Sequence, residues 1–238
     1  MFNELPASKI NNPKIVPQVF RESAVDGIIV NLLPVFSPQT VEYFERQPLP
    51  CVLLNLKRPL RCVYPDEFSG SAVAVKWLQK RGHQRIGYFS RQFPPAPHYS
   101  ALDRFAGFQQ AMKALGLPSD RHLELVRSRD AAAVPSLQRA EIFLQMFPDV
   151  DAVLCYEMEE AVCIAYAAER RGIRVPQQLE VVSFSERDVR GNTGLAIPTV
   201  LIPFQEVGRC AVEMLEVMIE DGNREVPSVA VPYKNMVV

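Results

Sequence analysis

Short runs of apolar, mostly β-branched residues alternate along the chain with longer segments in which apolar residues recur every three or four positions. The runs predict strands and the periodic segments predict helices, because side chains repeat every two residues in a strand and about every 3.6 in a helix. The predicted strands span residues 26–31, 50–56, 85–90, 123–128, 151–156 and 179–185. The predicted helices span residues 41–46, 68–81, 102–115, 137–147 and 157–171.

This alternation predicts an α/β fold. The predicted strands are apolar on both faces, which is typical of doubly wound parallel sheets that are covered by helices. Gly82, Gly116 and Gly172 each directly follow a predicted helix. A residue with positive φ commonly closes a helix at this position, so these glycines support the assigned helix ends.

Composition narrows the range of functions that this chain can have. With 238 residues and 48% apolar content, the chain can form one large domain or two small ones, and we expect a soluble, cytoplasmic protein without a targeting segment. A net charge of −1 gives it no basic surface for DNA or RNA. The five cysteines lack CxxC spacing and are predicted to be buried free thiols, not disulfides or zinc ligands.

The sequence does not predict an enzyme or a bound cofactor. His83, His98 and His122 are the only imidazole bases, and neither a nucleophile elbow nor a glycine-rich phosphate loop accompanies them. His83 follows a helix-ending glycine, which favours a capping or strand-entry role. His98 follows the proline-rich stretch 92–97, a candidate loop over a cleft.

The acidic cluster "YEMEE" follows a predicted strand. Glu157, Glu159 and Glu160 have no histidine partner, so no metal site is predicted. Carboxylates are favourable in the first turn of a helix, and this accounts for Glu159 and Glu160. Glu157 directly follows the strand and is expected at the carboxyl edge of the sheet.

In open α/β sheets, ligands bind outside the carboxyl ends of the strands. The side chains expected there are polar and aromatic, a mixture that suits a neutral polar ligand. The candidate ligand-binding residues at these positions are Asn31, Asn55, Tyr64, Glu157 and Ser185, with Arg91 and its following loop, and Tyr99 is a further candidate before the next predicted helix.

Several blocks of the chain, in order, resemble the effector-binding domain of the LacI/GalR transcription regulators. They include "VDGIIVN", "WLQKRGHQRIGYFS", "DRFAGFQQAMKALGL" and "IPTVLIPFQEVGRCAVEMLEVMIE". The resemblance implies a periplasmic binding protein type I-like fold, in which two doubly wound Rossmann-like subdomains clamp a ligand and are joined by three crossovers, near Tyr64, Pro203 and Pro232. The implied subdomains are residues 1–64 with 204–231, the first of them incomplete, and residues 65–203 with 232–238.

The resemblance also implies roles for two residues. Arg104 in "DRFAGF" matches the arginine that grips ligand hydroxyls in the family, since its guanidinium offers several fixed donors. The alternative is an exposed helix cation. Tyr64 matches an aromatic position that packs on the ligand, and the alternative is a core tyrosine.

The chain departs from the family at other site positions. Glu157 and Met158 stand where an Asn and an Asp are usual, Ser185 replaces a ligand-binding Asp, and Asn55 occupies a position that is often Asp. A polar small ligand remains the expectation, but not a simple hexose. Alternatively, Glu157 forms an ion pair with Arg104 and partly fills a vestigial cleft.

The leading hypothesis is therefore the ligand-sensing domain of a homodimeric regulator, binding a sugar or sugar derivative in a cleft and changing the angle between subdomains. The family's helix-turn-helix, hinge helix and first strand and helix of the sensor domain are expected to be missing from this chain, so DNA would be bound only through a missing domain. Two alternatives stay open: a transport-associated solute-binding protein and an enzyme on the same fold.

Overall fold

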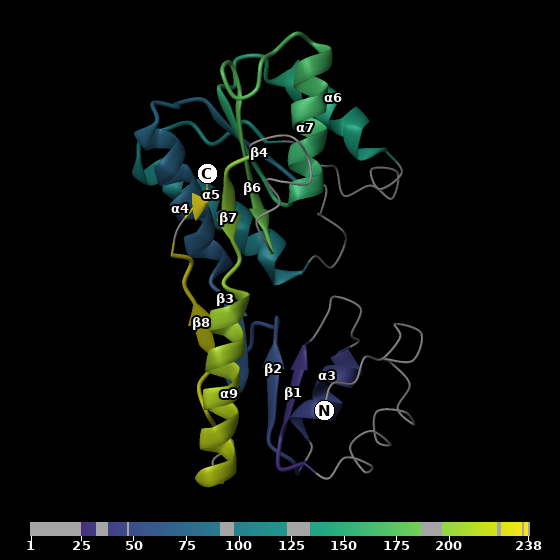
Figure 1. Cartoon of the computed structure of the whole chain (residues 1–238), viewed down its shortest axis with the longest axis vertical. Coiled ribbons are helices and arrows are strands. Elements are labelled where there is room, and N and C mark those ends of the chain that lie inside the picture. Colours follow the sequence, from purple (N-terminus) through teal and green to yellow (C-terminus); the bar gives the residue numbers. More distant parts are fainter. Residues whose placement is uncertain are drawn as a thin grey trace. The chain divides into compact units, whose positions relative to one another are not determined.

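The computed structural model describes residues 25–31, 38–46, 48–90, 98–122, 134–186, 197–222, 225–234 and 236–237 (Figure 1). The chain divides into two compact units. Unit 1 comprises Met1–Pro65 and Phe204–Val231, and unit 2 comprises Asp66–Pro203 and Pro232–Val238. Each unit therefore combines segments that lie far apart in the sequence.

Unit 1 is built on a parallel sheet of strand order β1-β2-β3-β8. Its strands are β1 (Ile28–Asn31), β2 (Cys51–Leu54), β3 (Cys62–Pro65) and β8 (Val229–Val231), and its helices are α3 (Pro38–Glu45) and α9 (Phe204–Glu220).

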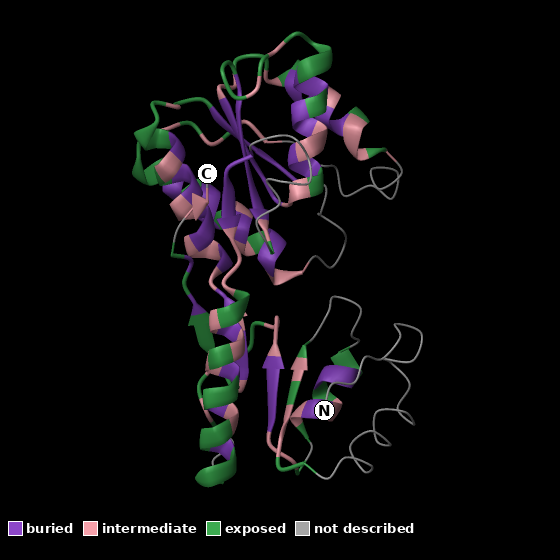
Figure 2. Cartoon of the chain, viewed as in Figure 1, coloured by how far each residue is buried: buried purple, intermediate pink, exposed green. Residues whose placement is uncertain are grey.

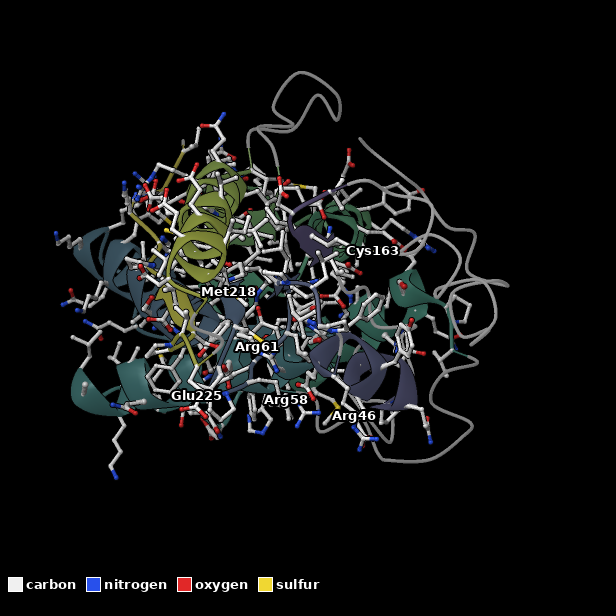
Figure 3. All side chains as sticks on the ribbon, turned by 90° about the horizontal axis from the view of Figure 1, so that it is seen from below. Arg46, Arg58, Arg61, Cys163, Met218 and Glu225 are labelled. Carbon is white, nitrogen blue, oxygen red and sulfur yellow. The ribbon has the colours of Figure 1, made fainter. Side chains whose placement is uncertain are left out.

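Successive residues of β2 enter different cores of unit 1. Cys51 and Leu53 pack with α3, whereas Val52 packs with α9 through residues such as Met218, which is labelled in Figure 3. Arg61, also labelled there, donates from Nη2 to the carbonyl oxygen of Glu45 at the end of α3 (3.1 Å). The sheet of unit 1 is thus covered by a helix on each face.

Unit 2 contains a sheet of order β4-β5-β6-β7-β9, in which only β9 runs antiparallel to its neighbour. The strands are β4 (Ile86–Phe89), β5 (Ala152–Cys155), β6 (Glu180–Ser185), β7 (Thr199–Leu201) and β9 (Met236–Val237). The helices are α4 (Glu67–Lys80), α5 (Tyr99–Ala114), α6 (Ser136–Met146) and α7 (Met158–Arg170).

The helices of unit 2 cover both faces of its sheet, with α4 and α5 on one side and α6 and α7 on the other (Figure 1). Tyr88 and Leu154 face α4 and α5, whereas the adjacent Phe89 and Val153 face α6 and α7. The strands are consequently buried on both sides, as Figure 2 shows in purple. Burial on both faces explains why these strands have continuous apolar sequences.

The predicted fold class is confirmed: both units are α/β with parallel sheets. Each predicted helix is present, with ends that differ by a few residues, and Gly82, Gly116 and Gly172 have φ values of 94°, 67° and 73° as expected for helix ends. All five cysteines are free, as predicted, although Cys163 and Cys210 are only partly buried.

Several short elements escaped the sequence pattern. No strand was predicted for β3, β7, β8 or β9, and the helix α9 was not predicted either. For β7, β8 and β9, two or three residues are too few to establish an alternation. The predicted strand 123–128, the loop 92–97 and Arg91 lie outside the described residues. Within the part of the chain that the structure describes, no helix is long and apolar enough to cross a membrane.

Candidate functional site

The carboxyl edge of the unit 2 sheet gathers most of the predicted site residues. Tyr99 is the first residue of α5, Glu157 is the N-cap of α7, and Ser185 is the last residue of β6. Cys155 of β5 pairs with Ser183 of β6 in parallel register, so Glu157 and Ser185 each lie two residues past a paired position at the same edge. Both residues are half-buried.

Arg104 lies in α5 and is directed into the protein interior. Its Nε donates to Glu67 Oε2 (2.6 Å) and its Nη2 to Glu67 Oε1 (3.0 Å), which makes a two-pronged ion pair. Its Nη1 donates to the carbonyl oxygen of Tyr156 (2.6 Å). The guanidinium carbon also lies 4.6 Å from the ring centroid of Tyr156 and 4.1 Å from that of Phe184.

These contacts decide against one interpretation of Arg104. Its side chain is only 5% exposed, so the alternative of an exposed helix cation is wrong. Burial by itself lowers the pKa of Arg104, but the charge and hydrogen bonds of Glu67, together with Tyr233 and Tyr156, outweigh this effect and hold the pKa above its ordinary value. The guanidinium is therefore charged, and its partner carboxylate compensates the cost of burying it.

The carboxylate that pairs with Arg104 is Glu67, which the sequence did not single out. Asp66 caps α4 by accepting a hydrogen bond from the Ser69 amide (3.2 Å), and Glu67 is the first residue of that helix. Glu67 Oε2 also accepts a hydrogen bond from the hydroxyl of Tyr233 (2.7 Å). Glu67 is 2% exposed, so this first-turn carboxylate is an interior group; only its place at a helix start was readable in the sequence.

A second polar chain joins α5 to the end of β5. The hydroxyl of Ser100 lies 2.8 Å from His98 Nδ1 and 2.7 Å from the hydroxyl of Tyr156. His98 is the N-cap of α5, and its ring accepts a hydrogen bond from the Ser100 amide. Because Ser100 is buried between two side chains, this serine and histidine form a structural bridge and do not present an exposed nucleophile.

The three acidic residues near the start of α7 differ in environment. Glu159 and Glu160 are in the first turn of the helix, as predicted, but Glu159 is exposed and Glu160 is completely buried. Glu157 precedes both and is half-buried at the carboxyl edge. Among the described residues, no group of three or more His, Cys, Asp or Glu side chains is placed to hold a metal ion.

The remaining predicted residues belong to unit 1. Asn31 ends β1 and is exposed, and Asn55 follows β2 with a left-handed backbone, φ 57°. Tyr64 is a residue of β3, not the residue after it, and its partly buried ring packs against the core formed with α3. Tyr64 therefore contributes to the core of unit 1.

His83 and His122 are not at the carboxyl edge. His83 lies just before β4, with Nδ1 3.5 Å from Asp151 and Nε2 3.8 Å from Glu180, at the edge where β5 and β6 begin. This agrees with the predicted strand-entry role. The ring of His122 packs on Phe105, with 4.8 Å between centroids.

Comparison with known proteins identifies the family. Residues 75–238, more than half of the chain, match the model of the periplasmic binding protein-like domain. A curated relative, the HTH-type transcriptional repressor PurR of Photobacterium profundum, is 23% identical over 211 residues, covering 87% of this chain and 62% of the relative. The HTH-type transcriptional regulator GntR of Pseudomonas aeruginosa is 28% identical over 181 residues, covering 74% of this chain and 50% of the relative.

Solved structures agree on the fold. The transcriptional regulator CelR in complex with cellobiose superimposes with a TM-score of 0.71 at 20% identity, covering 94% of this chain and 68% of that one. This chain spans about half to three fifths of the length of the curated relatives it matches. It belongs to the periplasmic binding protein-like family and corresponds to the effector-binding domain of the LacI/GalR regulators.

Proposed function

We propose that this chain senses a small polar metabolite, a sugar or sugar derivative, and transmits its binding to a DNA-binding helix-turn-helix elsewhere in a full-length regulator. The main support is the pair of half-buried polar side chains, Glu157 and Ser185, at the carboxyl edge of a sheet of this family. The relatives are transcriptional regulators by name, and the regulator CelR has been solved with cellobiose.

Each proposed contact follows from the chemistry of the side chain. The carboxylate of Glu157 accepts hydrogen bonds from ligand hydroxyls, and the hydroxyl of Ser185 both donates and accepts. Tyr99 offers a ring for stacking. Arg104 has five N–H groups, and Glu67 and Tyr156 engage three of them, so at most two remain for a ligand.

Asn31, Asn55 and Tyr64 are proposed as the contribution of unit 1. Ligand binding would then change the angle between the units, and this change would control DNA binding. The family also leads us to expect a homodimer that acts in the cytoplasm. We do not propose catalysis: in the described part of the chain, Ser100, whose hydroxyl contacts His98, is buried and hydrogen-bonded on both sides.

The function is tested by a thermal-shift screen of the chain against neutral sugars, sugar acids, sugar phosphates, nucleosides and amino acids. A ligand present at about 100 times its Kd adds about 2.7 kcal/mol to the free energy of unfolding. We expect one chemical class to stabilise the wild type, and Glu157→Gln and Ser185→Ala to lose most of that stabilisation.

The control variant is Glu159→Gln, which removes an exposed charge from the same helix turn and is expected to keep the full response. If no ligand class stabilises a cooperatively folded wild type, the sensing function is contradicted. If a ligand stabilises both site variants as strongly as the wild type, it binds elsewhere and the proposed site is wrong.

A further inference from the structure

The guanidinium of Arg104 already holds a carboxylate. Its Nε and Nη2 face is one of the two faces that can bind a carboxylate or phosphate in two-pronged fashion, and Glu67 occupies it at 2.6 and 3.0 Å, while Nη1 donates to the carbonyl oxygen of Tyr156. The two side chains are 5% and 3% exposed, so the pair is inside the protein and not at its surface.

Glu67 is itself held in place from several sides. One of its oxygens accepts from Arg104 Nη2, and the other accepts from Arg104 Nε and from the hydroxyl of Tyr233 (2.7 Å). Burial raises the pKa of Tyr233 well above its ordinary value, so this hydroxyl stays protonated and able to donate. An incoming anion would have to displace a carboxylate with three charge-assisted or hydroxyl hydrogen bonds.

The charge around the site also disfavours an anion. Glu67 neutralises Arg104, and Glu157 adds a further carboxylate directly after Tyr156, whose carbonyl accepts from Arg104. A ligand phosphate or carboxylate would therefore meet a compensated cation and an additional negative charge, with the cost of desolvation added.

We propose that Glu67 is an internal substitute for an anionic ligand and thereby a specificity-determining residue: it closes the Nε/Nη2 face of Arg104, neutralises its charge and restricts the site to ligands without a carboxylate or phosphate at that position. Arg104 then acts mainly as a positioning residue that joins the start of α4, the end of β5 and Tyr233. The inference deepens the proposed function, since it concerns the ligand class of the same edge.

The test is chemical rescue with acetate. Glu67→Ala removes a methylene and a carboxylate, which is close to the size of acetate, and leaves a buried cation without its partner. We expect this variant to melt at a lower temperature than the wild type, and acetate to raise its melting temperature by at least about 2 °C above sodium chloride of equal ionic strength. The wild type should respond equally to the two salts.

The matched control is Glu180→Ala. Glu180 is another buried carboxylate that pairs with an arginine, but its partner Arg81 is 49% exposed and already solvated. The Glu180→Ala variant should be less stable than the wild type, but acetate should raise its melting temperature no more than sodium chloride does. Failure of acetate to rescue a folded Glu67→Ala, or an equal response of the wild type or of Glu180→Ala, would overturn the proposal.

If Glu67→Ala does not fold in chloride, its refolding yield in acetate provides the second measurement, because acetate can supply the missing carboxylate to the buried guanidinium. The yield should rise with acetate concentration at constant ionic strength, whereas that of the wild type should not. Absence of this dependence would overturn the proposal. Neither readout requires the effector, so an unsuccessful ligand screen and an unsuccessful rescue are separate results.

Discussion

Single residues in this protein behave according to their burial. Cys51 and Cys62 are 2% and 0% exposed in neighbouring strands of unit 1. Burial raises the pKa of the Cys51 thiol to about 12 and that of Cys62 to about 11, from an ordinary value of 9.0. The thiols therefore stay protonated in the folded protein at a pH at which the unfolded chain loses the protons.

This difference predicts a loss of stability in alkaline solution. Because the pKa of Cys51 is raised in the folded state, its contribution to the free energy of unfolding is complete below pH 9. This contribution falls by about 1.4 kcal/mol per pH unit as the pH rises toward 12. Urea unfolding at pH 8 and pH 10 measures this loss. The free energy of unfolding should decrease less between these pH values for Cys51→Ala than for the wild type. An equal loss in both proteins would show that this thiol does not contribute.

At the scale of elements, α4 and α5 are packed unusually closely. A Cβ atom on Gly107 of α5 would lie 2.2 Å from the carbonyl oxygen of Phe68 in α4, so only glycine fits without a shift of the backbone. This contact places Glu67, next to Phe68, within reach of Arg104, one helical turn before Gly107. The glycine in "DRFAGF" thus has a packing role that periodicity could not reveal.

Gly107→Ala is expected to destabilise the protein by about 1–3 kcal/mol, because the added methyl group must push two helices apart. The matched control is Gly208→Ala in α9, where a Cβ atom meets nothing within 4 Å. That change should stabilise the protein by about 0.5–1 kcal/mol through the better helix propensity of alanine. The urea midpoints of the two variants measure both changes in stability. A Gly107→Ala variant as stable as the wild type would contradict the close packing.

The helices of unit 2 could be predicted from the sequence, whereas α9 of unit 1 was not among the predicted helices. The helices of unit 2 were located to within a few residues, since their apolar positions repeat over more than two turns. The three-residue strands β7 and β8 could not, because their identity depends on pairing with partners elsewhere in the chain: Val63 of β3, for example, pairs with Val229 of β8.

For the whole molecule, the important feature is that each unit has hydrophobic cores of its own. The only tryptophan, Trp77, lies in α4 and packs against a unit 2 core, with the guanidinium carbon of Arg81 4.7 Å from its ring centroid. Its fluorescence therefore reports on unit 2, whereas far-ultraviolet circular dichroism reports on both units. Chains with several cores often depart from two-state unfolding.

We predict that the two signals follow different urea transitions. Val52→Ala truncates a fully buried side chain of unit 1 and should lower its stability by about 2 kcal/mol, which shifts the circular dichroism transition but not the fluorescence midpoint. Val182→Ala, equally buried in unit 2, should shift the fluorescence midpoint. Coincident transitions that both variants shift equally would show that the two units unfold as one.

The amino-acid sequence alone was enough to establish the α/β class, the places of the helices of unit 2, their glycine ends and the polar residues near the strand ends. These properties are local, since they depend on side-chain period and on φ preferences of neighbouring residues. The partner of Arg104, in contrast, became apparent only in the folded chain. Glu67 lies 37 positions before it and Tyr233 lies 166 positions after Glu67, and burial makes this pairing necessary because an interior guanidinium requires a carboxylate.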